Sequence, residues 1–295
     1  MIRELIRQVS HVCDLVCVEY EIILVDDRSP DSSWDEILAI CGENSHVRGL
    51  RMARNVGQQI AVSAGLRYAS APLVIAMDGD LQNPPAAIPD ILGYLKAGFD
   101  VVYTVSTTRN TAIDAVTSWC FWWLMNNILR VGIVPNQLMM RGFSARALRA
   151  FNSYDEQIRN VVGISHDIGL NTIILKVENR KRHAGRSNYG FFKRFDVLLD
   201  VVLACSNRPL TYVIYLSFAT MAFGLCLGML TVINHLRYPE MPPGYASLAT
   251  LLICFGSATL AVLGIIGRYL ANIYTEVRRR PLFTVDQEIN FSHSQ

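Results

Sequence analysis

Two long stretches of this sequence contain no charged residue; they run from Pro209 to Asn234 and from Met241 to Gly267. Each is longer than the roughly 20 apolar residues that are needed to cross the hydrocarbon core of a bilayer. Over all 295 residues the charged fraction is only 18%, while hydrophobic residues reach 51%. This composition argues against an ordinary soluble enzyme and predicts two membrane helices.

The cysteines lack the spacings of a metal site or a disulfide framework. There are seven of them, an odd number, with no Cys-x-x-Cys pair and no histidine spacing of the zinc type. A reducing compartment and no zinc are therefore expected. The net charge of +2 gives no sign of a nucleic-acid partner, so we expect none. A signal peptide is not expected either, because the opening residues are charged and have the periodicity of an amphipathic helix.

The connector between the two apolar stretches, residues 235–243, is too short and too rich in proline to hold a domain. The two helices should therefore form a hairpin whose ends lie on one side of the membrane. Basic residues concentrate at these ends, whereas the connector has only Arg237. By the positive-inside rule, both chain termini face the cytoplasm. The flanking basic residues are Lys193, Arg194, Arg208, Arg268, Arg278, Arg279 and Arg280.

Residues 1 to about 180 alternate between strand-like and helical patterns, which is typical of a layered α/β domain. The apolar runs Glu21–Val25 and Leu73–Met77 predict strands, and each ends abruptly in acidic residues. Ligands of open parallel sheets bind outside the carboxyl ends of the strands, so both acidic clusters should line one crevice. A further strand is predicted at Asp100–Thr104, and crossover helices are predicted at Asp35–Ile40, Gln58–Tyr68 and Pro89–Lys96.

The tripeptide Asp78-Gly79-Asp80 places two carboxylates at the end of the second of these strands. Carboxylate oxygens are hard ligands that suit Mg²⁺ or Mn²⁺. Such an ion would bridge the phosphates of a nucleotide diphosphate and offset the charge that develops on the leaving group. On its own, the Asp-x-Asp pattern occurs by chance in many loops, so an ordinary loop is the alternative.

Two further segments have helical patterns. The uncharged segment Ala115–Leu129 is rich in tryptophan but short for a membrane span, which indicates a core or interfacial helix. In Phe191–Leu203, apolar residues recur at helical spacing and charged residues share the opposite face. An amphipathic helix in the membrane interface is one interpretation, and a helix that packs against a core is the other.

Ordered motifs surround these acids and extend to the end of the chain. They are VDDRSPD at 25–31, RNVGQQ at 54–59, DGDLQNPP at 78–85, MRGF at 140–143, RHAGRSNY at 182–189 and GRYLANIYTEVRRRP at 267–281. Together they resemble the family-2 inverting glycosyltransferases of the GT-A fold. Within that family the sequence is similar to the polyprenyl-phosphate glycosyltransferases, which include dolichol-phosphate mannose synthase, bactoprenol glucosyltransferases and undecaprenyl-phosphate aminoarabinose transferases.

The resemblance implies an organisation in four parts. A cytoplasmic GT-A domain would occupy residues 1–188, an amphipathic juxtamembrane helix 189–208, two transmembrane helices 209–270 and a cytoplasmic tail 271–295. The implied activity is inverting transfer of a sugar from a UDP- or GDP-sugar to polyprenyl phosphate, undecaprenyl phosphate in bacteria. The product would serve cell-envelope glycan or lipopolysaccharide modification at the inner membrane. A homo-oligomer, a tetramer by family resemblance, is the expected assembly.

The resemblance also implies roles for the donor side of the site. The two strand-end acids Asp26 and Asp27 would contact the base and ribose, with an Asx turn or helix cap as the alternative role. Arg54 would pair with the diphosphate, with a solvated surface charge as the alternative, and Asn55 and Gly57 would lie beside it. Asp78 would face the donor, Asp80 with Asp78 would hold the Mg²⁺ or Mn²⁺, and Gln82 would contact the sugar.

On the acceptor side, the implied phosphate ligands are Arg141, Arg182 and Ser187, because guanidinium groups and a hydroxyl suit phosphate oxygens. Arg182 lies in a basic run, so binding of anionic headgroups is its alternative role. The expected catalytic set is Asp78, Asp80, Arg141 and Arg182. A phosphate acceptor needs no strong general base, because its second pKa is about 6.

The sequence departs from the family pattern at several places. Relatives open with a strand and a Pro-x-Tyr/Phe-Asn-Glu turn, whereas Met1 here aligns with the helix that follows this turn. We therefore expect the central sheet to have an unpaired edge. Other usual residues are replaced: a glycine by Arg28, and basic residues by Ser106, Ala115, Val116 and Asn188.

These departures leave two other functions open. A degenerate relative could bind nucleotide or lipid, or scaffold a partner, without catalysis. A processive polysaccharide synthase of the same fold would carry a Gln-x-x-Arg-Trp motif, which the segment Glu156-Gln157-Ile158-Arg159-Asn160 resembles only superficially.

Overall fold

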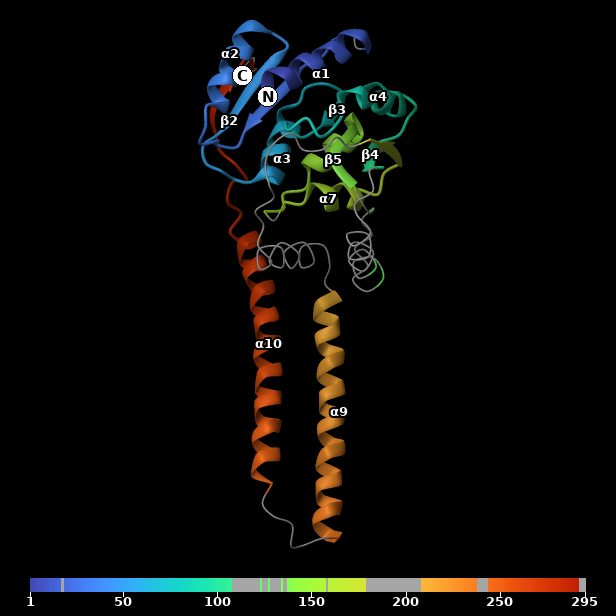
Figure 1. The fold of residues 1–295 in the computed structure, drawn as a ribbon, viewed down its shortest axis with the longest axis vertical. Helices are drawn as coiled ribbons and strands as arrows, with labels where there is room; N and C mark the ends of the chain where they lie inside the picture. The colour runs from blue at the N-terminus through green and yellow to red at the C-terminus, as the bar shows by residue number, and fades with distance from the viewer. Residues whose placement is uncertain are drawn as a thin grey trace.

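The computed structural model describes residues 1–16, 19–107, 123, 127, 134, 137–157, 159–178, 208–237 and 244–291. An α/β domain contains both labelled chain ends, and two long helices extend from it side by side (Figure 1). The segments expected at 115–129 and 191–203 lie outside the described residues, apart from isolated positions.

The first of two sheets has the strand order β1-β2-β7. Strand β1 (Ile22–Asp26) runs parallel to β2 (Val47–Met52), with Ile22 opposite Val47. Strand β7 (Val285–Ile289) pairs with β2 in the antiparallel direction, and the register shifts between Arg51 and Met52. A strand from the far end of the chain therefore completes this sheet.

The second sheet has the order β3-β5-β4-β6. Strand β5 (Gln137–Ser144) lies between β3 (Leu73–Ala76) and β4 (Val101–Ser106) and is antiparallel to both. Strand β6 (Thr172–Val177) is parallel to β4. The expected open parallel sheet is thus wrong for this half of the domain, because β5 is antiparallel to both of its neighbours.

Strands β1 and β3 each have one hydrogen-bonded neighbour among the described strands, so each presents an unpaired edge there. Both strands are apolar yet mostly half-buried, whereas β2 and β4 are largely buried. Glu21, directly before β1, bonds to the segment that leads into β3. Its Oε1 accepts hydrogen bonds from the backbone N–H groups of Ser70 and Ala71 at 2.8 and 3.1 Å.

Amphipathic helices cover the sheets, and their apolar faces form the core. Helix α1 (Ile2–Val16) packs Leu5 and Val9 against Ile91 and Leu95 of α4 (Ile88–Lys96). Helix α2 (Ser33–Glu43) packs on β2, helix α3 (Gln58–Tyr68) lies against β1 and β3, and α6 (Ala145–Asn152) and α7 (Val161–Asp167) pack against α3. The predicted crossover helices are therefore confirmed, and α3 has the predicted bounds.

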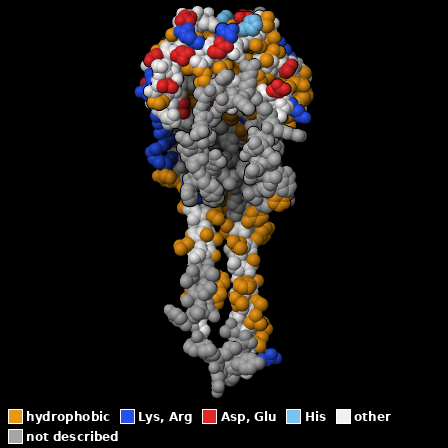
Figure 2. Space-filling view, in the orientation of Figure 1, with side chains coloured by type: hydrophobic (Ala, Val, Ile, Leu, Met, Phe, Trp, Pro, Cys, Tyr) orange, Lys and Arg blue, Asp and Glu red, His pale blue; other side chains and the backbone are white. Residues whose placement is uncertain are grey.

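The two long helices are α9 (Arg208–Arg237) and α10 (Tyr245–Val277). Leu210–Leu230 and Phe255–Val277 are long and apolar enough to cross a membrane, and neither is buried inside the protein. Hydrophobic side chains are prominent on both helices where side chains are coloured (Figure 2). Large exposed apolar residues favour a nonaqueous environment.

The chain after α10 returns to the α/β domain. Trp34 Nε1 donates to Gln287 Oε1 at 2.8 Å, and the Tyr68 hydroxyl donates to Glu288 Oε1 at 2.6 Å. Asn290 Nδ2 donates to the carbonyl of Val47 at 2.8 Å. The segment expected to be a tail, 271–295, therefore includes a strand that belongs to the sheet of the N-terminal domain.

Candidate functional site

The first part of the candidate site is Asp78, which follows β3 at its carboxyl end. Two amide side chains hold its carboxylate. Gln58 Nε2, at the start of α3, donates to Oδ1 at 2.5 Å, and Asn83 Nδ2 donates to Oδ2 at 3.2 Å. Asn83 is buried, so this second contact has little exposure to solvent. The orientation of Asp78 is thereby determined by two separate segments.

The second carboxylate, Asp80, is held by the turn that follows it. The backbone N–H of Gln82 donates to Asp80 Oδ1 at 3.1 Å, and its side-chain Nε2 donates to Oδ2 at 2.5 Å. Leu81, between Asp80 and Gln82, has a φ of +62°, a left-handed backbone conformation that bulky residues rarely adopt. Such strained positions are concentrated at functional sites, which marks this turn as a candidate.

Burial and the neighbouring charge of Asp80 raise the pKa of Asp78 above its ordinary value, while the hydrogen bonds from Asn83 and Gln58 and the charge of Arg141 act in the opposite direction. A bound cation would offset both the desolvation of Asp78 and its repulsion by Asp80, because it neutralises the carboxylate pair. The donor set thus fits a hard divalent ion such as Mg²⁺ or Mn²⁺. The part of the chain that the structure describes contains no group of three metal-ligating side chains.

The acids at the end of β1 make structural contacts. Asp27 Oδ1 and Oδ2 accept hydrogen bonds from the backbone N–H groups of Val56 and Gly57 at 2.7 and 2.8 Å. Asp26 is buried; its Oδ1 accepts from the N–H of Ser29 at 3.2 Å. Asp27 therefore connects the end of β1 to the start of α3. The Asx turn that was the alternative in this segment is present at Asp31, whose Oδ1 accepts the N–H of Ser33 at 3.0 Å.

The segment between β2 and α3 lies beside Asp27. Asn55 Nδ2 donates to the backbone carbonyl of Asp27 at 2.9 Å. Gly57 has a φ of +89°, which explains a glycine at this position, and Arg54 is exposed. The structure thus brings these predicted donor residues to the N-terminal end of α3, next to Gln58 and its contact with Asp78.

Arg141 lies in β5 and is completely buried. Its guanidinium donates to the backbone carbonyls of Leu138, Met139 and Val161 and to the Ser165 hydroxyl, at 3.2 to 3.5 Å. Desolvation lowers its pKa to about 10, although the charge of Asp78 acts to raise it. In this structure Arg141 joins β5 to α7, and its role as a phosphate ligand stays a prediction.

Two residues that hold Asp78, Gln58 and Asn83, were not among the predicted site residues. Gln58 lies directly beside Gly57 and Asn83 directly beside Gln82, so the available signal was their place within the motifs singled out in the sequence. The predicted phosphate ligands Arg182 and Ser187 lie outside the described residues.

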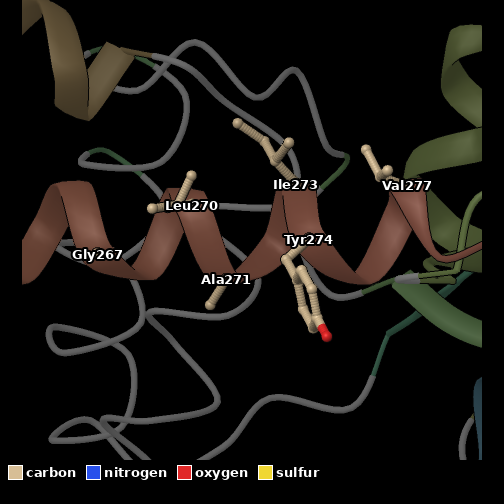
Figure 3. Close-up of a pocket in the computed structure, with 6 residues that line it drawn as sticks. All are labelled: Gly267, Leu270, Ala271, Ile273, Tyr274 and Val277. Atoms are coloured by element: carbon tan, nitrogen blue, oxygen red, sulfur yellow. The ribbon is translucent and has the colours of Figure 1, made fainter.

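A separate hollow of about 600 Å³ lies along α10. Apolar and aromatic residues of this one helix line it, and none of the predicted site residues does so (Figure 3). The lining residues are Gly267, Leu270, Ala271, Ile273, Tyr274 and Val277. The acids rather than this hollow are the candidate site for donor chemistry, because the hollow has almost no polar lining.

The sequence model of glycosyl transferase family 2 matches residues 1–153, a segment that includes Asp78, Asp80 and Arg141. The chain belongs to this family. It is an enzyme with an α/β GT-A-like domain, and it transfers a sugar from a nucleotide-sugar donor. The match ends before Arg182 and the two long helices, so it describes the donor side of this glycosyltransferase and not its acceptor.

One relative of this family 2 glycosyltransferase is an uncharacterized glycosyltransferase of Synechocystis sp., 28% identical over 270 residues, which are 91% of this chain and 85% of the relative. Among solved structures, glucosyl-3-phosphoglycerate synthase of Mycobacterium tuberculosis is 18% identical, with a TM-score of 0.47 over 69% of this chain and 75% of that chain. A mannosyltransferase of Pyrobaculum calidifontis was solved with GDP-Man and Mn²⁺. It is 14% identical, with a TM-score of 0.47 over 93% of this chain and 80% of that chain.

Proposed function

We propose that this glycosyltransferase transfers a sugar from a UDP- or GDP-sugar to polyprenyl phosphate, with inversion at the sugar carbon. The observation that carries the proposal is the combination of a paired-carboxylate site with two exposed apolar helices in one chain. A soluble acceptor would not require these helices. A lipid acceptor would, because its phosphate is at the membrane surface while its chain stays in hydrocarbon.

Asp78 and Asp80 would hold a Mg²⁺ or Mn²⁺ ion, which supplies Lewis-acid stabilisation of the leaving nucleotide. The remaining work belongs to side chains of this protein. Gln58 and Asn83 orient Asp78, and Gln82 orients Asp80, so that neither carboxylate has to reorganise when the donor binds. The exposed guanidinium of Arg54 is available to the donor diphosphate.

The acceptor needs orientation more than activation. A phosphate monoester is mostly ionised near neutral pH, since its second pKa is about 6, so one of its oxygens can attack without a strong general base. Arg141, Arg182 and Ser187 are the proposed ligands that place this oxygen opposite the leaving nucleotide. A single displacement from that geometry inverts the sugar carbon.

The chain order supports a hairpin topology for the two helices. Strand β6 precedes α9 and strand β7 follows α10, and both strands belong to the same α/β domain. A domain that includes both strands supports a hairpin whose two outer ends lie on one side of the membrane. The basic flanks favour the cytoplasmic side, so we place the domain and both termini at the cytoplasmic face of the inner membrane.

The product would be a lipid-phosphate-linked sugar for cell-envelope glycan or lipopolysaccharide modification, made by a homo-oligomer. The test is transfer of label from a panel of UDP- and GDP-sugars to undecaprenyl phosphate in detergent, with and without Mg²⁺ or Mn²⁺. Replacing Asp80 by Ala should lower transfer by at least about a hundredfold, because it removes a carboxylate from the metal site.

The control is Asp90→Ala, which removes an exposed carboxylate from the first turn of α4, and this variant should transfer at the wild-type rate. Full transfer by the Asp80→Ala protein would contradict the metal site. Equal use of a water-soluble acceptor by the wild type would contradict the lipid acceptor.

A further inference from the structure

The loop between α6 and α7, residues 153–160, contains the Glu-Gln-Ile-Arg-Asn segment to which the proposed function assigns no role. Arg159 holds this loop from inside. Its Nη1 and Nη2 donate to the carbonyls of Tyr154 and Phe151, and the guanidinium lies 4.7 Å from the centre of the Phe151 ring. Its Nε donates to the Ser63 hydroxyl on α3 at 3.1 Å. The loop is therefore firmly joined to α3.

The same loop is bound from outside by the last turn of α10. Both carboxylate oxygens of Glu276 accept the backbone N–H of Gln157, at 2.9 and 3.0 Å. Glu276 is half-buried, whereas its neighbours from Ile273 to Arg280 are exposed. A hydrogen bond to an ionised carboxylate is stronger than one between neutral groups. Glu276 thus links the end of the long apolar helix to the α/β domain.

From this loop, contacts lead directly to the candidate site. Asn160 caps α7 by accepting the N–H groups of Val162 and Gly163, both at 3.1 Å. The backbone N–H of Val161, the residue that follows Asn160, donates to Gln59 Oε1 on α3 at 3.0 Å.

The contact between Val161 and Gln59 leads to two predicted site residues, Arg141 and Asp78. The carbonyl of Val161 accepts from the guanidinium of Arg141 at 3.3 Å. The neighbour of Gln59, Gln58, donates to Asp78. A shift of the loop would therefore move the partners of Arg141 and of Asp78 together.

We propose that Glu276 is a positioning residue, through which the membrane helix α10 sets the orientation of Asp78 and Arg141. The proposal rests on the proposed function, since it takes α10 as a membrane helix and Asp78 as a donor-site acid. Its consequence is that the active site is in its working geometry when α10 is seated against the loop. Glu276 touches neither substrate nor metal in this mechanism; it acts through Gln157, Val161 and Gln59.

The experiment compares Glu276→Ala and Glu276→Gln in full-length protein reconstituted in lipid nanodiscs. The Ala variant should lose roughly five- to tenfold in kcat for transfer to undecaprenyl phosphate, the factor that one lost hydrogen bond represents. The KM for the nucleotide-sugar should stay within about twofold, because the donor contacts themselves remain. The Gln variant should recover most of the rate, since its amide oxygen still accepts the Gln157 N–H.

Glu288→Ala is the matched control. It removes the same charge from the same C-terminal segment and breaks a comparable contact with the domain, the 2.6 Å hydrogen bond from the Tyr68 hydroxyl. It should lower the unfolding temperature without lowering kcat. An unchanged kcat in Glu276→Ala overturns the proposal, and so does a Gln variant that is as impaired as the Ala variant.

Hydrogen exchange separates this inference from the proposed function. In Glu276→Ala, amides of residues 157–163 and 58–61 should exchange faster than in the wild type, while those of β1 and β2 should not change. This measurement needs no acceptor. If the wild type transfers nothing to undecaprenyl phosphate, the proposed function fails, yet faster exchange at 58–61 still supports the coupling and unchanged exchange there overturns it.

Discussion

At the scale of single residues, Arg28 shows how a departure from the family pattern is accommodated. It follows Asp26 and Asp27 with a φ of +57°, at a position where the resemblance in sequence predicts glycine. A side chain in this left-handed conformation costs about 1 kcal/mol or more relative to glycine. Arg28 also forms an ion pair with Asp286 of the returning C-terminal segment, at 2.5 Å. The backbone strain lowers the stability of the folded protein, whereas the ion pair raises it.

Two substitutions separate these contributions. Arg28→Ala and Arg28→Gly both remove the ion pair, but only Ala keeps a β-carbon in the strained conformation. The Gly variant should therefore be more stable than the Ala variant by about 1 kcal/mol. Thermal unfolding of the detergent-solubilised proteins measures this difference. Equal unfolding temperatures would show that the left-handed backbone at residue 28 carries no strain.

At the scale of elements, β5 pairs with both β3 and β4 in the second sheet, and α4 packs closely against it. A β-carbon added at Gly142 would lie 3.0 Å from Leu95 Cδ1 and closer still to Ile91 Cγ2. Both side chains belong to α4 and to the main core. Glycine at this position therefore allows the helix to approach the strand.

Replacing Gly142 by Ala should destabilise the protein by about 1 to 3 kcal/mol, because the added methyl group overpacks the contact between β5 and α4. The control is Gly93→Ala on the exposed side of the same helix, where a β-carbon would meet nothing within 4 Å. That change should stabilise the helix by about 0.5 to 1 kcal/mol. Denaturant titration of both variants checks the opposite signs; a neutral Gly142→Ala would contradict the close packing.

The elements also show what local patterns can predict. The apolar runs that end in acids correspond to β1 and β3, and the uncharged runs correspond to α9 and α10. A run of consecutive apolar residues was sufficient for these predictions. Strands β2, β5, β6 and β7 were not predicted, because their sequences carry charged or small residues such as Arg48, Arg141 and Gly142 whose partners are distant in the chain.

At the scale of the whole molecule, the helix pair α9 and α10 is inserted between two strands of one domain. Strand β7 extends from Val285 to Ile289, so a reporter joined inside it would remove a strand from the first sheet. A reporter therefore belongs after Gln295.

A reporter fused after Gln295 should be detected in the cytoplasm, and an epitope inserted between Glu240 and Met241 should be detected on the external side. The reason is that a domain containing β6 and β7 cannot lie on both sides of a membrane. Protease protection and impermeant labelling in intact cells measure both positions. Detection of the two tags on the same side would contradict the hairpin.

The sequence by itself determined the order of the apolar and acidic segments, and with them the family, the paired carboxylates and the two long helices. These features depend on consecutive residues. Only the tertiary structure decided that Gln58 and Asn83 hold Asp78, that Arg141 is buried against α7, and that Glu276 binds Gln157. The last contact joins residues 119 positions apart, and Arg28 and Asp286 are separated by 258. Such pairs leave no periodic pattern, because chain folding alone brings their elements together.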